Sequence, residues 1–162
     1  MPGRREPRPW KMPPIAKVYE ALGAIGDGRV HIVDDQHASV ASSDGSRSYQ
    51  VETSADGREI SSNDNASYWQ GYLGYPAIAV MIVRGLCHPR LDVIEALTAV
   101  PWKDLNDRFH NDYDRTLAEV LRRAEDRAFD PAAIQAEAGA VLAAVEQFAP
   151  LRGPRTRPPR SR

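Results

Sequence analysis

The sequence predicts an α+β protein with an N-terminal helix, a short antiparallel meander of three or four strands packed on an apolar helix, and a C-terminal helical hairpin or bundle. Residues 30–62 alternate apolar and polar side chains between turn signals, which is typical of short strands. Residues 76–149 carry apolar side chains at helical spacing, with a proline near most of the expected starts. The period changes within residues 61–86, and we expect the rest of the chain to converge on that stretch.

The first helix is expected to begin near residue 15, because apolar side chains from there on fall on one stripe. The stripe consists of Ile15, Val18, Tyr19, Leu22 and Ile25. Asp27-Gly28 then ends the helix, and Val30 starts the first strand. The turns between the following strands are Asp34-Asp35, Ser43-Asp44-Gly45-Ser46 and Asp56-Gly57. In the last strand, Ile60 should point toward the core.

The helix behind the meander should begin at Pro76 and end near Gly85, and it is so apolar that we expect it to be buried beneath the strands. Four more helices should begin at or near Pro89, Pro101, either Asn111 or Asp112, and Asp130-Pro131. The last two, at about 112–128 and 131–148, should form an antiparallel hairpin because the connection between them is short.

Charge separates the chain into an acidic body and two basic ends. Residues 1–14 carry a net +3, residues 150–162 carry +5, and the remaining 135 residues must hold −9. We expect both proline-rich ends to be disordered, although such segments can also contact phosphate groups. The body divides into a compact module at 15–86 and a helical extension packed on it at 87–149.

Composition excludes several classes of protein. The single Cys87 rules out an intrachain disulfide and a multi-cysteine metal site, and it fits a reducing cytoplasm. The sequence holds no run of about 18 apolar residues, so we expect no membrane span. The basic first residues are followed by no apolar signal-type stretch, so we expect a cytoplasmic protein. Nothing in the sequence indicates an oligomeric state.

The order of elements before residue 87 resembles that of a known module. A helix, a meander containing Ser48-Tyr49-Gln50-Val51 and a polar loop precede an apolar helix that opens with Ala77-Ile78-Ala79-Val80. This order resembles the SWIM zinc-finger domain, a ββα module in which a Cys-x-Cys pair ends the last strand and a Cys-x-His pair opens the helix. The resemblance implies an association with DNA binding or with protein–protein contact.

The metal ligands of that family are missing here. Residues 61–63 stand where the Cys-x-Cys pair belongs, and Gly74 and Pro76 stand roughly where the second pair belongs. No cysteine or histidine lies between His37 and Cys87. The resemblance therefore implies a degenerate, metal-free SWIM-like domain, and we expect no zinc and no other cofactor.

The junction between strands and helix is the expected binding site. Its candidate residues are Asn63, Asp64, Asn65, Tyr68, Trp69, Gln70, Tyr72 and Tyr75. The polar triplet 63–65 also suits a simple turn, and the aromatic rings also suit a core that replaces the missing zinc. We expect Trp69 to be buried in that core, and Tyr68 and Tyr72 to be partly exposed.

Two functions are therefore weighed. The first is a non-enzymatic binding or adaptor module without catalytic residues, with a protein partner slightly favoured over nucleic acid because the body is acidic. The alternative is a small metal-dependent hydrolase or nuclease that uses acidic and histidine side chains. Its candidates are Asp64, Asp107, His110, Asp112 and Asp114, and at least three of them would have to meet at one point.

Overall fold

A computed structural model describes residue 3 and residues 5–160, and it confirms the α+β class. The helices are α1 (Ile15–Gly26), the short π-helix η1 (Ala66–Gln70), α2 (Tyr75–Val83), α3 (Leu91–Ala96), α4 (Trp102–Arg108), α5 (Tyr113–Asp126) and α6 (Pro131–Phe148). The strands are β1 (Val30–Ile32), β2 (His37–Ala41), β3 (Ser48–Thr53), β4 (Glu59–Ser62) and β5 (Leu151–Arg152).

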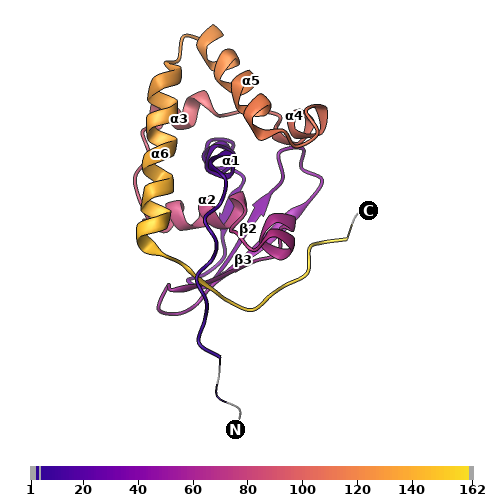
Figure 1. Ribbon diagram of the computed structural model, residues 1–162, viewed down its shortest axis with the longest axis vertical. Coiled ribbons are helices and arrows are strands. Elements are labelled where there is room, and N and C mark those ends of the chain that lie inside the picture. Colours follow the sequence, from indigo (N-terminus) through magenta and orange to yellow (C-terminus); the bar gives the residue numbers. More distant parts are fainter. Residues whose placement is uncertain (1–2, 4, 161–162) are drawn as a thin grey trace.

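Helix α1 lies at the centre of the molecule. Figure 1 shows it nearly end-on, surrounded by α2, α3 and α6. Its residues from Ala16 to Ala24 are all buried, which goes beyond the single apolar stripe that the sequence predicts. Glycine makes part of this close packing, because a methyl group at Gly23 would lie only 2.6 Å from the indole nitrogen of Trp102. The central helix therefore packs against neighbours along most of its length, and its charged side chains, Lys17 and Glu20, are mostly buried.

Strands β1 to β4 form the expected antiparallel meander, and the sheet order follows the chain. Val40, Val51 and Ile60 are almost fully buried in the core that the sheet shares with α2. Asp44 accepts hydrogen bonds from the Ser46 amide and hydroxyl in the β2–β3 turn, and the following Gly45 takes a φ of +74°. The hydrogen bonds of the turn thus fix the register of the two strands, and in this register their apolar side chains point into the core.

Both ends of the chain contact the sheet, which differs from the predicted disordered arms. Residues 151–152 form β5, which runs parallel to β4, and Pro9 bridges to Leu151 from the other direction. The Trp10 indole nitrogen donates to the Ile60 carbonyl over 3.0 Å. A two-residue strand has no periodicity to recognise, so neither contact could be seen in the sequence. Residues 1–2, 4 and 161–162 of the same prediction lie outside the described residues.

The C-terminal helices agree with the sequence prediction, and α5 and α6 pack as a hairpin. Asp112 caps α5 by accepting from the Arg115 amide, and Asp130 caps α6 by accepting from the Ala132 amide. One continuous core joins residues of α1 and α2 to residues of α3 to α6. Within the described residues, no helix has both the length and the apolar character that crossing a bilayer requires.

Candidate functional site

A cleft with a volume of about 680 Å³ opens where the sheet, η1, α1 and α4 meet. The β2–β3 turn and α4 form one side of it, and the segment from Asp64 to Tyr75 forms the other. Tyr113, at the start of α5, also lines the cleft. The cleft therefore coincides with the strand-to-helix junction that the sequence singles out.

The floor of the cleft is a buried ion pair on α1. The Lys17 ammonium lies 3.1 Å from Glu20 Oε2, and only 11% and 5% of the two side chains are exposed. Asn106 of α4 donates to the other oxygen of Glu20 over 2.6 Å. The Lys17 nitrogen lies 4.8 Å from the centre of the Tyr113 ring. Because buried charges are costly without partners, this network fixes the positions of all four side chains.

The charge state of Lys17 follows from the same contacts. Burial alone would lower the pKa of Lys17, since it disfavours the charged form. Glu20 and Tyr113 act in the opposite direction and together outweigh burial, so the pKa of Lys17 is raised above its ordinary value. The ammonium is therefore held charged at the floor of the cleft.

A second group of contacts forms the back wall. Arg29 donates to the Ala41 carbonyl over 2.7 Å and to Asp27 over 3.1 Å, and its guanidinium lies 5.8 Å from the Tyr75 ring centre. Tyr75 meets Tyr49 of β3 edge-to-face, with ring centres 6.2 Å apart. Burial raises the pKa of Tyr75, so its phenol stays protonated. This wall offers a fixed cation and two aromatic rings.

The rim at η1 depends on Asp64, whose carboxylate is buried. It accepts hydrogen bonds from the hydroxyl groups of Ser62 and Ser67 over 2.5 and 2.7 Å, and from the Ser67 amide over 3.1 Å. Ser67 in turn accepts from the Gly74 amide over 3.0 Å. A side chain at Gly74 would collide with the Asp64 carboxylate. Asp64 therefore shapes the rim and is not free to hold a ligand.

The opposite side is held by contacts between the β2–β3 turn and α4. The Lys103 ammonium lies 3.1 Å from Asp44, and the Lys103 amide donates to the Ser43 hydroxyl over 3.1 Å. Asn106, Asp107 and Asn111 extend the lining along α4 and the turn after it. Hydrogen bonding to Ser46, Ser42 and Lys103 lowers the pKa of Asp44, so this link is charged at neutral pH. Both walls of the cleft are thus supported from behind.

The structure brings six of the eight predicted site residues to the cleft. They are Asp64, Asn65, Trp69, Gln70, Tyr72 and Tyr75. Asn63 instead supports the β4 end by accepting from the Gln50 amide over 2.7 Å. Tyr68 lies under the guanidinium of Arg155, 4.0 Å from the ring centre.

The predicted burial of Trp69 is wrong, because 67% of the residue is exposed. The π-helical turn directs Ser67 inward toward Asp64 and leaves Trp69 outside. Tyr75, not Trp69, is the ring that packs on Tyr49. Tyr68 and Tyr72 are half-buried, as predicted.

The sequence analysis missed the floor of the cleft. The apolar stripe of the first helix gives no role to Lys17 and Glu20, and Asn106, Tyr113 and Arg29 are not among the predicted site residues. The available signal was the Lys-x-x-Glu spacing, which places two opposite charges on one helical face. That signal acquires meaning only when the helix is known to be buried on all sides.

The metal-dependent alternative lacks the geometry it requires. Among residues 3 and 5–160, no group of three or more histidine, cysteine, aspartate or glutamate side chains lies close enough to hold an ion. Asp64 is engaged by two serines, and Asp112 caps α5. Of the 107–114 candidates, Asp107 alone joins Asp64 in the cleft lining. Within the described residues, these candidates do not meet at one point as the hydrolase or nuclease interpretation requires.

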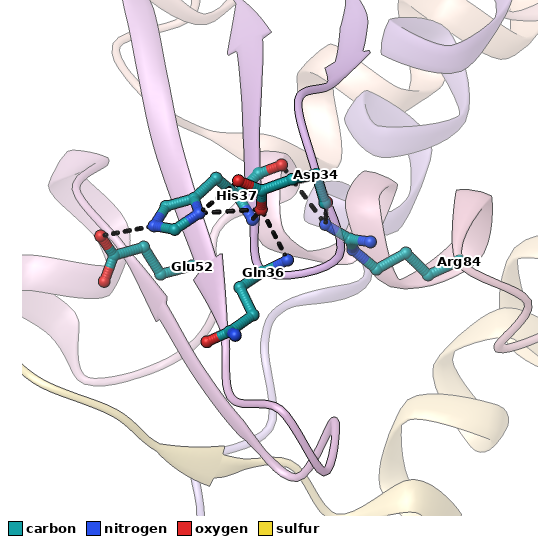
Figure 2. A network of polar contacts seen from close by, with 5 residues as sticks. All are labelled: Asp34, Gln36, His37, Glu52 and Arg84. Atoms are coloured by element: carbon teal, nitrogen blue, oxygen red, sulfur yellow. Dashed lines mark hydrogen bonds and ion pairs between the residues drawn. The ribbon is translucent and has the colours of Figure 1, made fainter.

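A polar cluster outside the cleft supports a turn. Figure 2 shows His37 between Asp34 and Glu52, with Arg84 reaching the same turn from the end of α2. The Asp34 carboxylate accepts from the Gln36 and His37 amides over 2.8 and 2.7 Å, and Arg84 donates to the Asp34 carbonyl. Hydrogen bonds from Gln36 and His37 lower the pKa of Asp34. These contacts fasten the β1–β2 turn to α2, and more than half of each of the side chains of Asp34, His37 and Glu52 is exposed.

The fold and the cleft define a small α+β protein built around the buried helix α1, with a preformed cleft at its strand-to-helix junction. The chain belongs to the family described as uncharacterised conserved protein UCP014422, whose model matches residues 10–150. No curated protein and no solved structure matches the chain. The family description mentions no zinc finger, so the SWIM-type resemblance stays a prediction.

Proposed function

We propose that this protein is a non-enzymatic binding module whose cleft accepts a segment of a protein partner. The observation that carries the proposal is Trp69, which is 67% exposed at the rim of a cleft whose floor is already fixed by buried contacts. A large exposed ring beside a preformed concave site is a common anchor in protein recognition. We also propose a cytoplasmic location, because the single Cys87 fits a reducing compartment.

The chemistry of the lining favours a polypeptide. The cleft presents both signs of charge, with Lys17, Arg29 and Lys103 facing it alongside Glu20 and Asp107. Its own ion pairs already neutralise most of these groups, so a ligand with a large net charge gains little there. A peptide backbone supplies hydrogen-bond donors and acceptors in equal number, which matches a lining of this mixed kind.

Amide and aromatic side chains at the mouth support the same conclusion. Asn65, Gln70 and Asn111 are exposed and line the cleft, and each amide can donate and accept at once. Tyr72 and Tyr113 lie half-buried between the floor and the mouth. Aromatic rings that combine apolar area with a polar tip are enriched at protein interfaces. We therefore favour a protein segment over nucleic acid at this site, because the paired charges of the lining offer phosphate little net attraction.

The test is peptide selection followed by calorimetry. The full chain is panned against a library of random peptides, and the selected peptides are titrated into wild-type protein, Trp69→Ala and the control Leu91→Ala. Leu91 is 82% exposed on α3 and does not line the cleft. Loss of an anchor at an interface hot spot weakens binding by more than about tenfold. We expect that loss for Trp69→Ala, whereas Leu91→Ala should bind like wild type.

Two results would contradict the proposal. The first is selection of no peptide that binds the wild-type protein in solution. The second is equal affinity of wild type and Trp69→Ala for every selected peptide, which would place the binding surface elsewhere.

A further inference from the structure

The two basic ends of the chain lie side by side, although the sequence places them about 140 residues apart. Pro9 bridges to Leu151 in the antiparallel direction. The Arg152 amide donates to the Arg8 carbonyl over 2.7 Å, and the Trp10 amide donates to the Pro150 carbonyl over 3.0 Å. Segments that were expected to be independent arms therefore form a single surface next to β4.

This pairing gathers positive charge into a basic band. The band consists of Arg8, Lys11, Arg152 and Arg155, and segments 8–11 and 152–155 contain no acid. Lys11 and Arg152 come together at Gly71, where an added methyl group would lie within 3.8 Å of both side chains. All members of the band except the half-buried Arg152 are exposed. The band contrasts with the rest of the protein, which is acidic.

Aromatic rings alternate with the cations of the band. The guanidinium of Arg152 lies 4.7 Å from the Trp10 ring centre, and that of Arg155 lies 4.0 Å from the Tyr68 ring centre. Arg155 also donates to the Tyr68 carbonyl over 2.9 Å, which fastens the C-terminal segment to η1. The Tyr68 ring in turn meets Trp69 edge-to-face at 4.6 Å. The row of cations thus ends beside a large ring that is open to solvent.

We propose that the basic band binds single-stranded nucleic acid, with phosphates along the cations and a base stacked on Trp69. Grooves or rows of positive charge beside exposed aromatic rings are how proteins hold single strands without reading their sequence. A duplex keeps its bases stacked inside and offers no free face to Trp69. The positive charge of the band favours a polyanion. A single nucleic acid strand also supplies a base that can stack on Trp69, which an acidic protein surface does not.

This inference goes beyond the proposed peptide site and stands on other residues. The band lies outside the cleft lining, and Trp69 is the one residue that the two surfaces share. Most of the band also lies beyond residues 10–150, which the family model matches. Variants of Arg8 and Lys11 therefore test the band without changing the cleft.

The experiment measures the anisotropy of a fluorescently labelled oligothymidylate of about 12 nucleotides, a typical site size for such proteins, over a series of salt concentrations with the full chain. The band variants are Lys11→Gln and Arg8→Gln. Their matched controls are Arg122→Gln, which pairs with Glu119 on α5, and Arg90→Gln, which pairs with Asp92 before α3. The replaced side chains are surface groups in all four, and circular dichroism checks that each variant is folded.

We expect wild-type binding to weaken as salt rises, because bound cations release counterions from the phosphates. Each band variant should reduce the slope of log affinity against log salt by about 0.7, and the controls should keep the wild-type slope. Trp69→Ala should keep the slope but lower affinity roughly tenfold, because it removes one stacking platform.

Absence of binding at low salt would overturn the inference, as would band variants with an unchanged slope. Equal competition by inorganic polyphosphate together with full affinity in Trp69→Ala would also overturn it, because the band would then be a general polyanion surface. Duplex DNA that binds as tightly as the single strand would contradict the role of base stacking.

Discussion

Lys17 and Glu20 are the residues that distinguish this helix from an ordinary buried one. Both are at least nine-tenths buried on α1, yet they face the cleft and not a wholly apolar core. The pair connects α1 to α4 through Asn106 and to α5 through Tyr113. A change at either residue should therefore affect stability and the shape of the site together.

Lys17→Met should destabilise the protein by about 3–5 kcal/mol, because it leaves the Glu20 carboxylate buried without its cation. The double variant Lys17→Met with Glu20→Leu should cost less, since it removes both charges and leaves apolar groups of similar size. Urea denaturation of the three proteins measures this difference. If the double variant were as unstable as Lys17→Met, the stability loss of the single variant would not come from the unpaired Glu20 carboxylate.

The pH dependence of stability has a sign that follows from the raised pKa of Lys17. A group whose pKa is higher in the folded state stabilises it below the unfolded pKa, about 10.4 for lysine, and this contribution is lost as pH rises through the folded value. We expect urea midpoints to fall as the pH rises above about 10. Part of that fall should be missing in Lys17→Met, and an identical fall in both proteins would refute this assignment.

Trp69 and Trp102 make a matched pair for the contrast between rim and core. Trp102 is 4% exposed, and its replacement by alanine should cost about 3–5 kcal/mol. Trp69→Ala should cost less than about 1 kcal/mol, as surface changes usually do. Thermal or urea unfolding of both variants checks this order. A large loss for Trp69→Ala would mean that its ring packs against the fold in solution.

Residue patterns predicted the position of the site better than its interior. The density of rings and amides at 63–75 led to the junction where the cleft lies, because such residues suit a strand-to-helix turn. Burial of a single ring such as Trp69 depends on the turn geometry of η1, which no period of two or 3.6 describes. The charges of the floor lie on α1, where the Lys-x-x-Glu spacing shows the pair but not the burial of the helix that carries it.

At the scale of elements, the π-helix is held by one carboxylate. Asp64→Ala would leave the hydroxyl groups of Ser62 and Ser67 and the Ser67 amide without their acceptor. Each buried polar group left unpaired costs about 1–3 kcal/mol, so we expect a loss of several kcal/mol in urea denaturation. Asp64→Asn should retain part of this stability, because its amide oxygen still accepts.

The Asp64 variants also separate a structural role from a binding role. If Asp64 shapes the rim, peptide affinity should fall in proportion to the loss of structure and recover with Asp64→Asn. An Asp64→Ala protein as stable as wild type but unable to bind peptide would instead make Asp64 a direct contact.

Helices and strands with strong local signals were predictable, and short or non-local ones were not. Asp112 and Asp130 are N-cap residues and Pro131 is a first helical residue, and these residue types can be recognised as helix starts from the sequence alone. Strand β5 has two residues and pairs with β4 across about 90 positions of the chain. Such pairing depends on tertiary packing, which a sequence pattern does not encode.

At the scale of the whole molecule, both proposed surfaces meet at η1. The cleft lies on one side of this short helix, and the basic band reaches its other side through Arg155 and Tyr68. The buried α1 provides the rigid frame behind the cleft, and the paired chain ends provide the frame beneath the band. A peptide and a nucleic acid strand would therefore compete for Trp69 but not for Lys17 or Lys11.

The most direct test of the cleft as the binding site is an NMR titration of the full chain with a selected peptide. We expect the amide signals of Tyr72, Asn106, Asn111 and Tyr113 to shift in wild-type protein, because these residues line the cleft. The same peptide concentration should shift them much less in Trp69→Ala, because that variant binds the peptide more weakly. Shifts confined to residues away from the cleft, such as those of β1 or α6, would contradict the account.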